Sequence, residues 1–184
     1  KEYTGKPVTQ NIVIKNGNVV LDEGSDYTVT YSANTKVGTV EVTITGTGSY
    51  IGEIKSSFDI LPAKQQIQKL ETRFKGFFID WAQKGSATGY EIEYSTNADF
   101  KDSTVKKLTA NKPDTLTISG LTAGNKYYVR VRSYTNVGEK VYYGAWSDSK
   151  NVTAAKYDIT KSAISGISTK TYTGKNITQS VKVK

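Results

Sequence analysis

The chain has 184 residues and contains no cysteine, histidine or methionine. This composition excludes disulfides, thiolate nucleophiles, histidine-based catalytic triads and imidazole metal sites. The net charge of +8 favours solubility over nucleic-acid binding, because the lysines are scattered through the chain and do not form a run. We therefore expect no nucleic acid as a partner.

Short segments in which polar and apolar residues alternate follow one another along the chain. Valine, isoleucine, threonine and tyrosine dominate these segments, as is typical of β-strands. The clearest strands are predicted at 28–32, 39–45, 90–95, 116–119 and 127–134. Asn16-Gly17, between two apolar runs, predicts a hairpin. No amphipathic helix and no membrane insertion is expected, so the sequence predicts an all-β chain of tandem β-sandwiches, arranged as beads on a string.

Two boundaries divide the chain into three parts. A strand ends near Ile60, and Pro62, which cannot donate to a central ladder, marks a junction before a new strand near Ile67. A second junction follows Val152, and a new part begins near Tyr157. The predicted domains are 1–62, 63–155 and 156–184.

One phrase occurs twice in the chain. It reads YTGKPVTQNIVIK from Tyr3 and YTGKNITQSVKVK from Tyr172, 169 residues later. A repeat of this period indicates a unit made of one sandwich, a second domain and the start of the next sandwich. Residues 157–171 precede the second copy, whereas Lys1 and Glu2 alone precede the first, so we expect the first sandwich to lack its leading strand. The tail is then expected either to add a strand to a sandwich, in another copy or in its own chain, or to remain loose.

The middle part resembles a fibronectin type III domain. The resemblance is carried by Trp81 in FFIDWAQ, Tyr90 in ATGYEIEYS, Leu121 and Tyr127 in LTAGNKYYVRV, and Trp146 in GAWSDSK. It implies that Trp81 is buried in the core on the second strand. It also implies that Leu121 and Tyr127 form a tyrosine corner, in which the Tyr hydroxyl is hydrogen-bonded to upstream backbone.

The first part and the tail resemble small immunoglobulin-like repeats found in long surface or secreted proteins of gram-positive bacteria. The motif YTGK, followed by GSDYTVTY at 24–31 and FDI at 58–60, carries this resemblance. It implies an extracellular location at the cell surface or cell wall, and an array of modules, but no reaction. The leading expectation is a non-catalytic structural or adhesive spacer without a cofactor.

A group of aromatic and basic residues is the candidate ligand surface. The strand at 127–134 directs its arginines and its last tyrosine outward. Hairpin pairing is expected to bring Trp146 beside the arginines, an arrangement similar to the Trp–Arg ladder of cytokine-receptor fibronectin domains. The group comprises Arg130, Arg132, Tyr134, Tyr142, Tyr143 and Trp146. It is either a stiffened sheet edge or a platform for a host glycan or protein.

Acidic residues offer two further candidates, and neither predicts a catalytic or metal site. Glu91 and Glu93 share one face of a strand about 7 Å apart, but Ile92 points inward, so they are expected to be solvated charges and not a glycosidase pair. The segment LDEGSD at 21–26 lacks the spacing of a calcium loop. Asp26 is expected instead to hydrogen-bond local backbone in a turn.

Three other roles stay open at this point. The chain could be a ligand-binding module for a host glycan or matrix protein. It could be a self-assembling unit whose copies are linked by strand exchange of the tail. It could also comprise accessory domains of a secreted hydrolase, since fibronectin-like modules often sit beside such enzymes.

Overall fold

The computed structural model describes residues 1–83, 85–112, 114–171 and 173–183. Its strands, in chain order, are β1 (Lys15–Asn16), β2 (Val19–Val20), β3 (Tyr27–Tyr31), β4 (Gly38–Gly46), β5 (Glu53–Ile60), β6 (Ile67–Arg73), β7 (Gly76–Trp81), β8 (Gly89–Ser95), β9 (Thr104–Leu108), β10 (Thr115–Ile118), β11 (Lys126–Val137), β12 (Lys140–Tyr143), β13 (Lys150–Thr153), β14 (Ile164–Ser165) and β15 (Lys182–Val183). A 3-10 turn, η1 (Ile159–Lys161), lies between β13 and β14. Within the described ranges, no helix is long and apolar enough to cross a membrane. The prediction of an all-β chain is confirmed.

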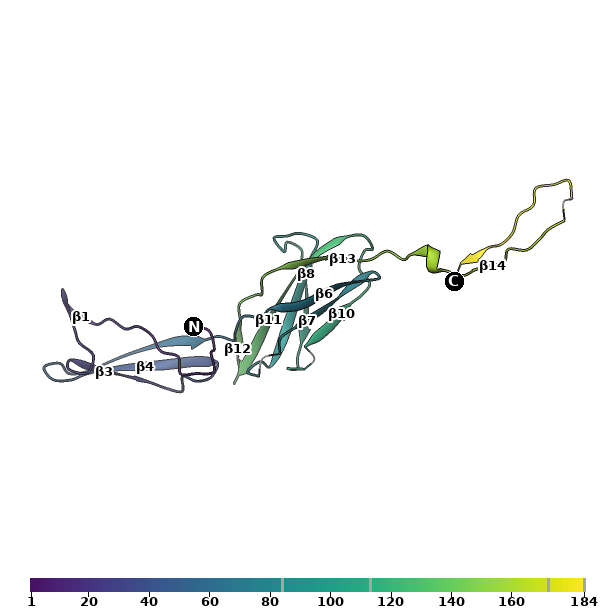
Figure 1. Ribbon diagram of the computed structural model, residues 1–184. Coiled ribbons are helices and arrows are strands. Elements are labelled where there is room, and N and C mark those ends of the chain that lie inside the picture. Colours follow the sequence, from purple (N-terminus) through teal and green to yellow (C-terminus); the bar gives the residue numbers. More distant parts are fainter. Residues whose placement is uncertain (84, 113, 172, 184) are drawn as a thin grey trace.

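The strands gather in two bodies that lie one after the other, and the tail extends beyond the second (Figure 1). We call residues 1–60 the first body, residues 67–155 the second body and residues 156–183 the tail. Residues 61–66 connect the two bodies.

A three-stranded antiparallel sheet of order β3-β4-β5 forms the first body. β4 alternates strictly, so Val40, Val42 and Ile44 are buried on one face. Segment 4–14 forms no strand, yet its side chains cover this face: Val8 is buried in a cluster with Val40. Further along, two isoleucines of the same segment pack against the cluster that contains Val42 and Ile44. An irregular segment therefore supplies the second layer of this small core.

The hairpin predicted at Asn16-Gly17 is confirmed, with its turn shifted by one residue. Asn16 is itself paired, opposite Val19, so Gly17 and Asn18 form the turn. Gly17 has a φ of 61°. Asn18 has no positive φ, so glycine in the left-handed conformation at the first turn position fits a two-residue hairpin turn of type II′.

The second body is a sandwich of two antiparallel sheets. One has the order β10-β7-β6 and the other β12-β11-β8-β9, with β13 also paired to β11. Trp81, at the end of β7, is fully buried, and its ring lies 5.3 Å from that of Tyr90 on β8. Val129 and Val131 of β11 complete the same core. The predicted burial of Trp81 on the second strand of this body is confirmed.

The tyrosine corner is also confirmed. The backbone N–H of Thr122 donates a hydrogen bond to the hydroxyl of Tyr127 over 3.1 Å. Leu121 packs half-buried against the core of the sandwich. This bond fixes the loop that precedes β11, so it sets where the longest strand of the molecule begins.

The tail has almost no buried residues. β14 and β15 are two residues long and pair with each other, Ile164 opposite Val183. Near the start of the tail, the ring of Tyr157 lies edge-on against Phe74 of the second body, with centroids 5.7 Å apart. The two strand-forming segments expected in the tail thus form only a minimal hairpin.

We expect Tyr127→Phe to lower the free energy of unfolding by about 1 kcal/mol, because the Thr122 N–H loses its acceptor. Tyr128→Phe is the matched control, since the Tyr128 hydroxyl makes no hydrogen bond among the described residues. Urea unfolding of both variants measures the difference, and equal losses would contradict the role given to the corner.

Candidate functional site

The pairing of β8 with β11 sets two arginines opposite two glutamates. Arg130 faces Glu93 and Arg132 faces Glu91 in the antiparallel register. Val129 and Val131, the alternate residues of β11, are fully buried in the core. The strand therefore directs its valines into the sandwich and its arginines to the other face of the sheet, as the alternation predicts.

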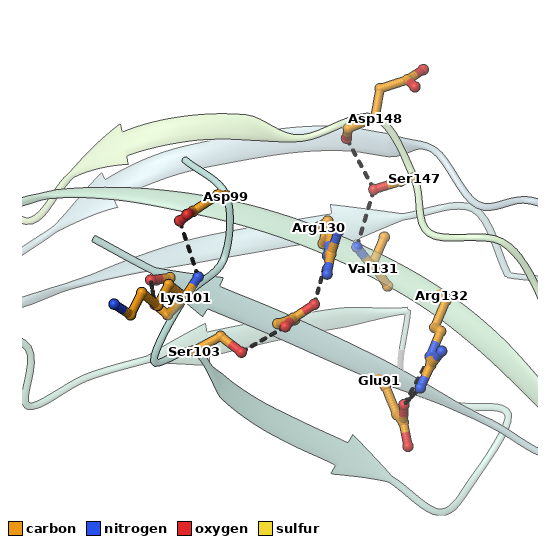
Figure 2. A network of polar contacts seen from close by, with 11 residues as sticks. Glu91, Asp99, Lys101, Ser103, Arg130, Val131, Arg132, Ser147 and Asp148 are labelled. Atoms are coloured by element: carbon orange, nitrogen blue, oxygen red, sulfur yellow. Dashed lines mark hydrogen bonds and ion pairs between the residues drawn. The ribbon is translucent and has the colours of Figure 1, made fainter. Parts of the chain in front are cut away.

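Both glutamates accept hydrogen bonds from the arginines opposite them. The Nε of Arg130 donates to the carboxylate of Glu93 over 2.5 Å. Arg132 donates to one oxygen of Glu91 through Nε at 2.9 Å and Nη2 at 2.7 Å. The hydroxyl of Ser103 adds a bond of 2.6 Å to Glu93. Figure 2 shows the bond from Arg132 to Glu91, and it shows Ser103 bonded to the carboxylate that Arg130 also contacts.

The expectation that Glu91 and Glu93 are solvated is wrong. Each is only 7% exposed. They do share one face of β8, but the arginine side chains on one side and β9 on the other cover them, and Lys107 of β9 lies 3.8 Å from Glu91. Sequence alternation gives the face of a residue, and it does not show what neighbouring strands place over that face.

A continuous stack of rings and guanidinium groups covers the ion pairs. The guanidinium carbon of Arg132 lies 4.2 Å from the ring centre of Trp146 and that of Arg130 lies 4.8 Å from it. Phe100 closes one end of the stack, 4.0 Å from Arg130, and Tyr143 closes the other, 4.2 Å from Arg132. The expected contact of Trp146 with both arginines is confirmed. We call these five residues the ladder.

Trp146 is held in the ladder by the residue that follows it. The N–H of Ser147 donates to the carbonyl of Val131 over 2.8 Å, and the N–H of Val131 donates to the hydroxyl of Ser147 over 3.0 Å. The Ser147 hydroxyl in turn donates to the carbonyl of Asp148 over 3.0 Å (Figure 2). Trp146 belongs to no strand, so this reciprocal pair of bonds takes over the role of strand pairing.

Phe100 was not foreseen from the sequence. It lies in the loop between β8 and β9 with a φ of 61°, a conformation that is rare for a bulky residue. Backbone and side-chain bonds hold this loop: the Ser95 hydroxyl and the Asn97 amide both donate to the carbonyl of Lys101. The cation–π contact with Arg130 accompanies this uncommon backbone state. Nothing in the local sequence signals it.

Two residues of the predicted ligand surface are buried. Tyr134 is 2% exposed and donates to the carbonyl of Leu108, beneath the ammonium group of Lys107. Tyr142 is 5% exposed, and its hydroxyl lies 2.8 Å from that of Thr39 in the first body. The expectation that Tyr134 and Tyr142 belong to an exposed aromatic patch is therefore wrong. Tyr143 and Trp146 remain half-exposed.

The chemistry of this face is that of an internally satisfied network. The arginines donate hydrogen bonds to Glu91 and Glu93, and their guanidinium groups lie against aromatic rings. This arrangement fits a stabilising role more closely than ligand binding. In the part of the chain that the structure describes, no group of acidic side chains could hold a metal ion. Asp26 accepts a bond from the N–H of Asp22 over 2.9 Å, which confirms its predicted place in a turn.

We expect Arg132→Met to lower the free energy of unfolding by about 2–3 kcal/mol, because it leaves the buried Glu91 carboxylate without its main partner. The double variant Arg132→Met/Glu91→Gln removes that charge and should recover part of the loss. Lys126→Met, on the same strand and exposed, is the control. Denaturant unfolding measures all three, and a loss below about 0.5 kcal/mol for Arg132→Met would show that the ion pair contributes nothing.

Comparison with known proteins bears on the second body. The fibronectin type III domain matches residues 69–150, which is less than half of the chain. No curated protein matches. Among the solved structures that do, the crystal structure of chicken CNTN1 FN1-FN3 domains has 14% sequence identity and a TM-score of 0.47, and the match covers 66% of this chain and 44% of that chain. The chain thus spans less than half the length of that structure. The family match at residues 69–150 agrees with the two-sheet sandwich, the buried Trp81 and the tyrosine corner of the second body. The chain therefore contains a fibronectin type III domain.

Proposed function

We propose that this chain is a rigid, non-catalytic spacer in a repetitive bacterial surface or secreted protein, where it holds neighbouring modules in a fixed orientation. The observation that carries the proposal is a network of side-chain bonds across the junction between the first body and the fibronectin domain. The repeated phrase at residues 3 and 172 supports the idea of an array.

One half of the junction network centres on Asp59, near the end of β5. Its carboxylate accepts a bond of 2.6 Å from the hydroxyl of Thr39 and one of 3.1 Å from the ammonium group of Lys140 on β12. The hydroxyls of Thr39 and Tyr142 lie 2.8 Å apart. The Thr39 hydroxyl and then Lys140 lower the pKa of Asp59, and Asp59 in turn raises the pKa of Lys140. The β11–β12 hairpin of the fibronectin domain is thereby attached to the first body.

The other half of the network holds the connecting residues. The N–H of Lys64 donates to the carboxylate of Glu2 over 2.7 Å, and the hydroxyl of Ser133 donates to the carbonyl of Ala63 over 3.2 Å. Gly144 passes so close that a Cβ on it would lie 2.7 Å from the carbonyl oxygen of Pro62. The connection is therefore bonded to the first body on one side and to the fibronectin domain on the other.

These contacts restrict orientation more than they add stability. Domains joined in one chain normally move relative to each other unless their interface is large and apolar. Exposed ion pairs contribute little to unfolding free energy, but several short bonds from different directions leave few relative orientations that satisfy them all. A spacer needs this property, whereas a flexible tether does not.

We expect Asp59→Ala to loosen the junction without altering the melting of either body, because it removes the acceptor shared by Thr39 and Lys140. NMR relaxation should give one tumbling time for both bodies in the unaltered chain and two separate times in the variant. Glu53→Ala, at the other end of β5 and exposed, is the control. Independent tumbling of the two bodies in the unaltered chain would refute the rigid-spacer proposal.

Low pH should loosen the junction in the same way as Asp59→Ala. The folded-state pKa of Asp59 is lowered, so its contribution to the junction is present above the ordinary aspartate pKa of about 3.9 and is lost as the pH falls through the lower folded value. We expect the orientation to hold from neutral pH to about pH 4 and to loosen below it. The relaxation measurement repeated along a pH series, with intrinsic tryptophan fluorescence as the check on folding, tests this. Loosening that begins near neutral pH would rule out Asp59 as the cause.

A further inference from the structure

We infer that the fibronectin domain carries a binding site for a single sugar unit. The site is a cavity of about 270 Å³ between the β8–β9 loop and the loop that contains the tyrosine corner. We call it the polar cavity. It shares no lining residue with the ladder or with the junction, so the inference goes beyond the spacer function and does not depend on it.

The polar cavity lies at the end of the fibronectin domain that is away from the first body. β8 ends at Ser95, which pairs with Tyr128 near the start of β11, whereas the other end of β11 pairs with β12, the strand that contacts the first body. The β8–β9 loop contributes Asp102 to the lining, and the tyrosine-corner loop contributes Thr122. The lining comes from residues 94–127 alone.

Tyr94 presents an unused hydroxyl to the polar cavity. It is 9% exposed, and its ring packs edge-on against those of Phe77 and Tyr127, with centroids 5.6 Å and 6.4 Å away. Its hydroxyl makes no hydrogen bond with another described residue, and it is not one of the fully enclosed polar atoms that lack a partner. The hydroxyl therefore reaches the cavity from a ring that the core holds in place.

Tyr127 adds a second hydroxyl whose proton is free. It is 8% exposed and lines the same cavity. Its oxygen accepts the bond from the Thr122 N–H that forms the tyrosine corner, and no described residue accepts its proton. Two tyrosines that are more than nine-tenths buried thus each have a hydroxyl donor without an acceptor among the described residues. Buried polar groups normally have a partner, so these donors indicate an acceptor that comes from outside the chain.

Asp102 supplies a carboxylate at the rim of the polar cavity. This carboxylate makes no hydrogen bond or ion pair with another described residue. The φ of Asp102 is 53° and that of Phe100 in the same loop is 61°, in the left-handed region that residues other than glycine seldom adopt. These two turns of the backbone bring Asp102 to the cavity. Uncommon backbone conformations of this kind cluster at functional sites.

The donors and the acceptor together select the class of ligand. A metal ion or an ammonium group has no acceptor for the tyrosine protons, and a phosphate or carboxylate group would be repelled by Asp102. An apolar ligand would leave all these groups unpaired. A neutral molecule with both donors and acceptors satisfies them. Neighbouring hydroxyl groups of a sugar ring have this chemistry, since one can accept from Tyr94 while the next donates to Asp102.

The size of the polar cavity suits one sugar ring. Pockets for drug-sized ligands occupy about 300–1,000 Å³, and the polar cavity lies just below that range. The exposed side chains of Thr96 and Thr104 also line it, and their hydroxyls can both donate and accept. Because the tyrosine rings lie in the core, the sugar would be held by hydrogen bonds at its edge and not by stacking. We therefore expect dissociation constants in the millimolar range.

An NMR chemical-shift titration of the isotope-labelled full chain tests the inference. The probes are glucose, galactose and N-acetylglucosamine as free sugars, and maltotriose and cellotriose as chains. At least one should shift the amide signals of residues 94–104 and 120–127 saturably and leave those of the first body unchanged. Shifts from a free sugar would identify the unit itself as the ligand, and shifts from a trisaccharide alone would identify a unit within a chain.

Two outcomes of the titration would overturn the inference. One is that no sugar gives a saturable shift at hundreds of millimolar, which would show that water alone occupies the polar cavity. The other is that ethylammonium chloride or calcium chloride shifts the same signals while the sugars do not, which would show that the site binds cations.

Two substitutions test the assigned groups. Tyr94→Phe should weaken the binding of the sugar roughly 3- to 10-fold, because it removes one hydrogen bond. Tyr128→Phe, the same change on the outward face of β11, is the control and should leave the binding unchanged. The Tyr94 hydroxyl makes no bond with the described residues, so Tyr94→Phe should melt like the unaltered chain. Equal affinities of the two variants would reject the site.

The second substitution is Asp102→Asn, which suits the loop because asparagine also adopts the left-handed conformation. It should weaken the binding about 3-fold, since a bond to a charged acceptor is replaced by one to a neutral acceptor. Asp99→Asn, in the same loop but outside the lining of the cavity, is its control. Equal effects of the two changes would contradict the role of Asp102. None of these experiments involves Asp59 or Lys140, so their failure would leave the spacer proposal intact.

Discussion

The period-two alternation of β11 is the constraint on which the remainder of the structure depends. Its inward face supplies valines to the core of the fibronectin domain, and its outward face supplies Arg130 and Arg132 to the ladder. The same strand pairs with β8, β12 and β13. A shift of one residue in its register would put both arginines into the core and both valines under Trp146. Core, ladder and junction are therefore specified together.

The ladder explains how a sheet can bury carboxylates on its outer face. A buried carboxylate is costly unless it is paired and hydrogen-bonded. Each of the two glutamates of β8 has an arginine directly opposite it on β11. The aromatic rings then shield the arginines, with gains on the order of 0.5–1 kcal/mol per exposed cation–π contact. Every residue of β8 is buried as a result, although only alternate residues face the core. The outer face of this sheet acts as a second, polar core.

Much of the fold follows from the sequence because alternation and turn chemistry are local. The strands and the contact of Trp146 with the arginines could be predicted in this way, whereas the burial of Trp81 and the Tyr127 corner were implied by the resemblance to a fibronectin type III domain. The burial of Glu91 and Glu93 could not, because it depends on side chains that arrive from neighbouring strands.

The same limit applies to the candidate ligand surface. Tyr142 has the alternation of a surface residue, and it is buried because another domain lies against it. Phe100 enters the ladder through a left-handed backbone conformation that no short motif announces. Sequence patterns thus predict the faces of single strands well, and they do not predict contacts between sheets, loops and domains.

The position of β13 has a consequence for a chain pulled at its ends. β6 leads into the fibronectin domain and β13 leads out of it, and the two strands belong to different sheets. The four residue pairs between β13 and β11 lie across the direction of pull, so tension would load them together in shear and not open them one by one. The junction network attaches the first body to the other end of the same β11–β12 hairpin. Mechanical load would therefore pass from one module to the next along β11, and the resistance of the domain would be set by its rate of forced unfolding and not by its equilibrium stability.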